Sequence, residues 1–142
     1  SWPWTEDKDG SRIDMSKIPP KSTRAYDVSY VTDMTEGWYA ITNQGTGVGF
    51  GFHFPKELFK YLWYWQSLGG GFGYPWYGRT YNIGLEPFTS HGFQGLANAV
   101  DNESALTLEA KQKIEVTQMA VAYTGIKGVG QINSDGTVIP KK

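Results

Sequence analysis

The sequence predicts an all-β fold, an antiparallel β-sandwich, and three observations lead to this class. Short stretches rich in Val, Thr and aromatic residues recur along the 142 residues. Turn residues such as Glu36-Gly37 and Asp101–Ser104 separate these stretches at short intervals. Helix-like sequence is limited to one turn at Pro55–Phe59 and a short stretch at Phe93–Val100. Lys60–Ser67 could extend the first of these, but its Tyr and Trp density favours a strand. Many short strands joined by frequent turns are typical of a sandwich.

The composition excludes several classes of partner. Thirteen Lys and Arg residues nearly balance fourteen Asp and Glu residues, so a net charge of −1 attracts neither nucleic acid nor an anionic membrane surface. The absence of cysteine excludes disulfide bonds and cysteine-ligated zinc. No apolar run approaches the roughly 20 residues of a membrane span.

The first 25 residues are polar and proline-rich, and we expect an extended connector with at most a short strand near Arg12–Met15. Asp7–Gly10 resembles the start of a calcium loop, but Arg12 and Ile18 stand where such a loop needs Gly and Glu, so we expect no metal site. The opening residues lack a signal peptide, which favours a cytoplasmic location. The chain does not begin with Met, so we expect a processed or truncated end.

The first strands are expected at Tyr26–Met34 and Trp38–Thr42, joined as a hairpin through Glu36-Gly37. The stretch Gly45–Phe54 alternates glycine with apolar residues, so one face of that strand is bare glycine ending in His53. A bare face lets another backbone or a ligand approach closely.

Further strands are expected in the aromatic middle and at the end of the chain. In Lys60–Ser67, Trp63 and Trp65 share one face, and in Arg79–Pro87 a small polar face carries Glu86. The remaining expectations are strands at Ala105–Glu109 and Gln112–Tyr123 and a hairpin within Gln131–Pro140. No repeat or linker divides the chain, so we expect one domain.

The segment Tyr61–Phe88 indicates a ligand site. Ten of its 28 residues are aromatic, and Glu86 is its one carboxylate. Aromatic faces cover the apolar face of a pyranose, while amides, carboxylates and guanidinium groups bind its hydroxyls. The segment therefore predicts a sugar site.

Several residues have a functional and a structural interpretation. Glu86 could be a general base among aromatic walls, or it could pair with Arg79 or lie in water. His53 and His91 could donate a proton, or they could be surface or capping residues. Arg79 could bind a sugar hydroxyl or form a salt bridge. The aromatic residues Trp63, Trp65, Trp76 and Tyr77 could stack on a sugar or belong to the core.

Three blocks of residues, YLWYWQ at 61–66, YPWYGR at 74–79 and GLEP at 84–87, resemble the C-terminal half of aldose 1-epimerase (galactose mutarotase)-like proteins. The resemblance runs from about Arg12 to Tyr123. It implies that residues 1–142 form the C-terminal portion of one β-supersandwich domain, with residues 1–25 as a connector or first strand.

The resemblance also implies a function, the interconversion of sugar anomers by acid–base catalysis without a cofactor. Glu86 in GLEP matches the family's catalytic base. The family's acid histidine lies in an upstream half with no counterpart here, so the implied partner is that missing half or a second chain. With the sugar site, this makes six residues candidates for substrate contact: Arg79, Asn82, Trp65, Trp76, Tyr77 and His53.

Two other functions remain open. The first is a non-catalytic carbohydrate-binding domain that uses the same cleft. The second is a glycosidase or lyase accessory domain, which for glycosidase chemistry needs a second carboxylate about 5–10 Å from Glu86. Asp33, Glu36 and Glu57 are the candidates for that carboxylate.

Overall fold

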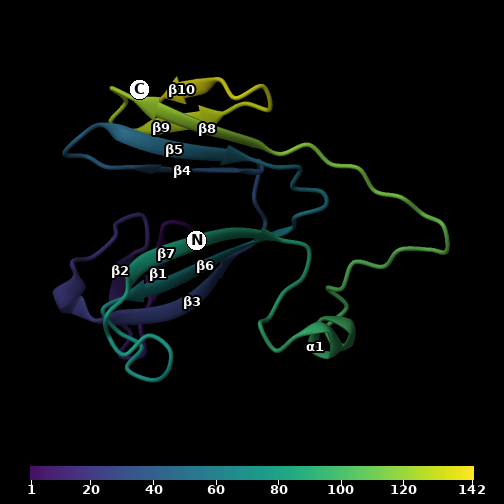
Figure 1. Ribbon diagram of the computed structural model, residues 1–142, viewed down its shortest axis with the longest axis horizontal. Helices are drawn as coiled ribbons and strands as arrows, with labels where there is room; N and C mark the ends of the chain where they lie inside the picture. Colours follow the sequence, from purple (N-terminus) through teal and green to yellow (C-terminus); the bar gives the residue numbers. More distant parts are fainter. The chain divides into compact units, whose positions relative to one another are not determined.

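The computed structural model describes residues 1–142 and confirms the all-β class with antiparallel pairing (Figure 1). Besides one 3-10 turn at Lys21–Thr23, the only helix is α1 (Leu96–Asp101). The strands are β1 (Trp4–Glu6), β2 (Arg12–Asp14), β3 (Ala25–Val31), β4 (Trp38–Thr42), β5 (Val48–His53), β6 (Tyr61–Leu68), β7 (Tyr81–Phe88), β8 (Met119–Thr124), β9 (Val129–Ile132) and β10 (Val138–Pro140).

The chain forms two compact units, and each is built from two separate stretches of sequence. The first unit comprises Ser1–Val31 and Trp63–Glu86, and the second comprises Thr32–Leu62 and Pro87–Lys142. The three-stranded sheet β3-β6-β7 belongs largely to the first unit, and the sheet β4-β5-β8 belongs to the second.

The first unit is organised by β6, whose alternation follows the expected pattern. Tyr64 and Gln66 are buried on one face, while Trp63 and Trp65 are half-buried on the other. Where β6 ends, the buried Ser67 hydroxyl bonds to the Thr80 hydroxyl at 2.6 Å. This bond joins the end of β6 to the residue just before β7, so it holds the intervening aromatic loop at both ends.

The second unit is a sheet covered on one face by the β9–β10 hairpin. The strands β4 and β5 form an antiparallel hairpin, and β8 pairs with the other edge of β5. Ile132 of β9 is fully buried, and a methyl group at Gly51 would lie 2.6 Å from its Cδ1 atom. The Tyr123 ring covers Gly49, and its hydroxyl bonds Thr42 Oγ1 at 2.7 Å. The glycine face of β5 is therefore filled by the chain's own side chains, rather than open to a ligand.

The predicted hairpin between Tyr26–Met34 and Trp38–Thr42 is wrong. β3 lies in the sheet with β6, and β4 pairs with β5 instead. The link between β3 and β4 does not make a tight turn. Asp33 has a positive φ, and the buried Gly37 accepts a hydrogen bond of 2.8 Å from the Phe54 amide. This bond joins the start of β4 to the end of β5, so it holds β4 against β5.

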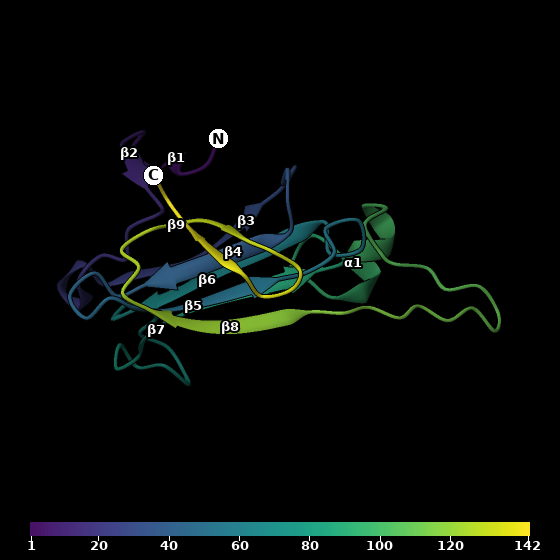
Figure 2. The same cartoon turned by 90° about the horizontal axis from the view of Figure 1, so that it is seen from above.

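The predicted strands at Ala105–Glu109 and in the first part of Gln112–Tyr123 are also wrong. Only Met119–Thr124 is a strand, and residues 106–118 are exposed and pair with no strand. A strand needs a neighbour for its backbone groups, and no strand lies beside this segment in either view (Figures 1 and 2). The N-terminal stretch, conversely, contains a small hairpin of β1 and β2 rather than one strand.

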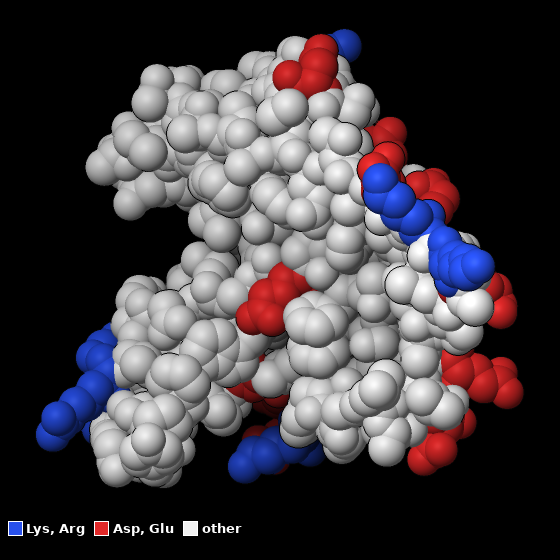
Figure 3. All heavy atoms as spheres, turned by 45° about the vertical axis from the view of Figure 1, so that its right-hand side comes forward, with Lys and Arg blue, Asp and Glu red and all other residues white.

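Charged side chains of both signs are interspersed on the face shown in Figure 3, where much of the surface carries no charge. None of the helices is long and apolar enough to cross a membrane.

Candidate carbohydrate site

Six of the seven predicted site residues lie in the first unit. Trp65 belongs to β6, and Glu86 and Asn82 belong to β7. Trp76, Tyr77 and Arg79 lie in the loop between these strands. His53 belongs to the second unit, at the end of β5.

Trp65 and Trp76 form a pair of half-buried rings in the first unit. Their ring centroids lie 4.9 Å apart, with an interplanar angle of 48°. The loop positions Trp76 through a turn in which the amides of Trp76 and Tyr77 both donate to the Gly73 carbonyl at 3.0 Å. The Arg79 amide then donates to the Trp76 carbonyl at 2.9 Å, which closes the turn before β7 begins.

The Glu86 carboxylate folds back over Gly84 beside the Trp65 ring. A methyl group built at Gly84 would lie 2.5 Å from Glu86 Oε1 and 3.5 Å from Trp65 Cε3. The carboxylate and the ring thus share one side of β7, in the space that a side chain at position 84 would fill. The ion pairs of the chain, Lys17–Asp14 and Lys113–Glu115, do not involve Glu86.

Arg79, Asn82 and Tyr77 are exposed and are not joined to this group. Apart from the backbone bond between Arg79 and Trp76, none of them makes a hydrogen bond, ion pair or ring contact with Trp65, Trp76 or Glu86. Tyr77 instead packs edge-on against Tyr74, at 6.1 Å between ring centroids. Arg79 contributes its backbone carbonyl, which accepts a bond of 3.0 Å from Lys21 Nζ. The structure therefore brings together three of the six first-unit candidates, and the salt bridge between Arg79 and Glu86 is absent.

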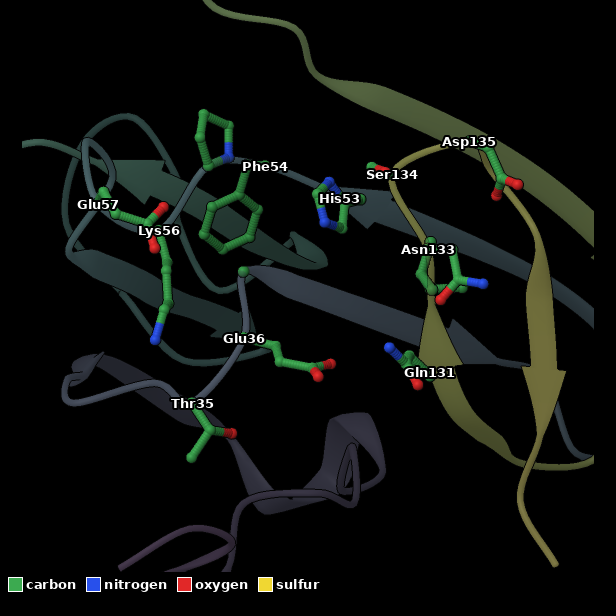
Figure 4. Close-up of a pocket in the computed structure, with 13 residues that line it drawn as sticks. Thr35, Glu36, His53, Phe54, Lys56, Glu57, Gln131, Asn133, Ser134 and Asp135 are labelled. Atoms are coloured by element: carbon green, nitrogen blue, oxygen red, sulfur yellow. The ribbon is translucent and has the colours of Figure 1, made fainter.

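The second unit contains a polar cavity of about 520 Å³ beside β5 and the β9–β10 turn (Figure 4). The side chains of His53, Glu36 and Gln131 lie around this opening, and Glu36 and Gln131 extend toward one another (Figure 4). Glu57 lines the same cavity. Two of the three carboxylates considered for a glycosidase thus line the same cavity as His53. Asp33 does not line this cavity.

Nothing in the sequence indicated that three polar residues line this cavity: Gln131, Asn133 and Asp135. Their stretch predicted only a hairpin. The Thr137 amide donates to Asp135 Oδ1 at 2.8 Å, and this bond lowers the pKa of the Asp135 carboxyl. Asp135 therefore keeps its negative charge at neutral pH, and its polar neighbours come from the same turn.

His91 has a structural environment. Its amide donates to Ser104 Oγ at 2.9 Å, and its carbonyl accepts from Asn102 Nδ2 at 3.0 Å. Its ring lies 5.5 Å from the Tyr61 ring. The two hydrogen bonds tie the loop before α1 to the end of that helix through the His91 backbone.

Comparisons with known proteins give no match: no family model, no curated protein and no solved structure is similar to this chain. The candidate site therefore has to be interpreted from its own geometry.

Proposed function

We propose that this chain binds a carbohydrate on the face of the first unit that carries Trp65, Trp76 and Glu86. The observation behind this proposal is the position of the Glu86 carboxylate over Gly84 and beside Trp65. A pyranose has an apolar C–H face and a rim of hydroxyl groups. An indole ring covers the face, and a carboxylate accepts hydrogen bonds from the rim. The Trp65–Trp76 pair and Glu86 supply both elements on one side of a strand.

A second candidate function is anomer interconversion with Glu86 as the base. It is favoured by the position of the Glu86 carboxylate beside the Trp65 ring, because the reaction needs a base next to the bound sugar. The reaction also needs an acid. Both histidines of the chain belong to the second unit, so the first unit supplies no imidazole. The acid would come from a second chain or from an upstream half of the domain, as the resemblance to mutarotases implies.

The binding proposal is tested by titrating the protein with a panel of aldoses and uronic acids while tryptophan fluorescence and ligand-observed NMR are recorded. Trp65→Ala and Trp76→Ala should each raise the Kd of a bound sugar by about tenfold, because each removes a stacking surface. Trp2→Ala is the matched control, since Trp2 is an exposed ring of the same unit, and its Kd should stay within about twofold of wild type. If no sugar binds at millimolar concentration, the proposal is wrong.

Glu86→Gln separates binding from catalysis. The amide keeps the size of the side chain and an acceptor oxygen, so a binding protein should lose only about threefold to tenfold in affinity. A mutarotase should lose its catalysed anomer exchange, measured by NMR exchange spectroscopy, because an amide does not take up the proton. Glu103→Gln, an exposed carboxylate of the second unit, is the control for both measurements.

A further inference from the structure

The extended segment before β8 is the part of the second unit that has the fewest partners. Every residue from Leu106 to Gln118 is exposed. Figures 1 and 2 both show this stretch running out between α1 and β8, apart from the strands. Residues 113–118 make no backbone hydrogen bond, whereas backbone groups in folded proteins are normally paired.

The sequence of this segment has the pattern of a strand from Gln112 onward. Ile114 and Val116 alternate with Lys113 and Glu115, so one side is apolar and the other is charged. Lys111 has a φ of 68°, which sets the start of the extended stretch after it. Beyond Gln118 the chain continues directly into β8, which is an edge strand of its sheet. An edge strand with unpaired backbone groups is a template for another strand.

The charges of the segment are complementary to those of a second copy. If two copies pair antiparallel about a twofold axis at Ile114, then Lys113 of each copy lies opposite Glu115 of the other, and Gln112 lies opposite Val116. Opposite charges directly across an antiparallel pair are stabilising. Centring the pair on residue 113 or 115 would instead place two like charges against each other. The register at Ile114 is therefore the one that satisfies both charges.

We propose that residues Gln112–Val116 pair with the same residues of a second copy of this chain, antiparallel and centred on Ile114. The pairing gives partners to the backbone groups of residues 113–116, which make no backbone hydrogen bond within the chain, and brings the two Ile114 side chains together on one face. It replaces the exposed intrachain pair Lys113–Glu115 with two pairs between chains. This interface lies in the second unit and does not depend on the sugar site.

Sedimentation velocity over a range of protein concentrations at low salt tests the proposal with charge reversals. The wild-type chain should form a dimer. Lys113→Glu and Glu115→Lys each place like charges opposite one another twice, so each should raise the dimer dissociation constant by about tenfold or more. An equimolar mixture of the two variants should form a heterodimer, because every cross-strand pair is then attractive. The double variant Lys113→Glu/Glu115→Lys should also dimerise.

Two controls reverse a charge outside the paired stretch. Glu109→Lys lies in the same exposed segment, and Lys142→Glu lies at the C-terminus. Both should dimerise as wild type does. A wild-type chain that stays monomeric at the highest concentration overturns the proposal. A dimer that persists in both Lys113→Glu and Glu115→Lys also overturns the proposal, because that dimer uses another surface. The proposal is overturned as well if both variants lose the dimer and their mixture does not restore it, because the two charges are then not opposite each other.

Discussion

At the scale of single residues, Gly84 leaves free the space that the Glu86 carboxylate occupies. A methyl group at position 84 would occupy the space of Glu86 Oε1, and the flexible end of Glu86 can move away. We therefore expect Gly84→Ala to change the free energy of unfolding by less than about 1 kcal/mol but to weaken sugar binding about as much as Glu86→Gln does.

The matched control for this prediction is Gly73→Ala, a glycine of the same unit with no atom within 4 Å of its added methyl group. Urea unfolding and the sugar titration are measured on both variants. If Gly84→Ala binds sugar with wild-type affinity, the position of the carboxylate over Gly84 does not matter for binding.

A second residue-scale prediction concerns pH. Burial raises the pKa of the Tyr64 hydroxyl above its ordinary value of 10.0. The folded state therefore favours the neutral phenol, and this contribution to stability is complete below pH 10 and is lost as pH rises through the folded-state pKa. Tyr64→Phe cannot ionise, so it should lose less stability than wild type between about pH 8 and pH 11.

Urea unfolding at the two pH values measures this difference. Tyr74→Phe serves as the control, because Tyr74 is 84% exposed and folding does not remove its hydroxyl from water. An equal loss of stability in the wild type and in Tyr64→Phe would show that Tyr64 is not the group responsible.

At the scale of elements, the contact between Gly51 of β5 and Ile132 of β9 joins the hairpin to the sheet. Gly51→Ala should cost about 1–3 kcal/mol in unfolding free energy, because its methyl group would lie 2.6 Å from Ile132 Cδ1 and 3.2 Å from Val121 Cγ1. Ile132→Ala should cost about 2–5 kcal/mol, because it removes a fully buried side chain.

The double variant should cost less than the sum of the two single variants. The methyl group at position 51 then enters part of the space that Ile132 leaves. Urea unfolding of all four proteins gives the coupling, and Gly45→Ala in the β4–β5 loop controls for the general effect of a methyl group on a glycine. Additive costs would show that the two positions do not share this space.

The positions of individual strands could be predicted from the sequence better than their pairing. Trp38–Thr42 is a strand at the predicted bounds, and the turn after Asn43 is confirmed by Asn43 Oδ1, which accepts from the amides of Gly45 and Thr46. The partner of β4 depends on a contact with Phe54, which is distant in sequence. Alternation also predicted a strand at Gln112, but alternation reports only how side chains are arranged and not whether a neighbouring strand is present.

The candidate site could be predicted only in part, because alternation indicates the faces of a strand but not its contacts with distant residues. The pairing of Trp65 with Glu86 follows from two strands whose faces the alternation indicates, and Trp76 adds to them from the loop. Arg79 was assigned to a strand, but it precedes β7 and is exposed. The cavity around His53 combines Glu36 with Gln131, which are 95 positions apart, so local patterns in the sequence carry no sign of it.

At the scale of the whole molecule, the expected single domain is organised as two units that alternate along the chain. The first unit holds the proposed carbohydrate site, and the second holds the polar cavity and the proposed pairing strand. Ligand binding and self-association are thus assigned to different units. The substitutions above can remove either ligand binding or self-association without changing any side chain of the other unit.

This alternation has a consequence for how the protein is made. As the chain leaves the ribosome, β4 and β5 emerge before the first unit has received β6 and β7. The glycine face of β5 is covered only after β8 and Ile132 have been synthesised. The first unit can be complete at residue 86, whereas the second closes only near the C-terminus. A ribosome that stops early releases a chain whose second sheet still lacks its edge strand and its cover.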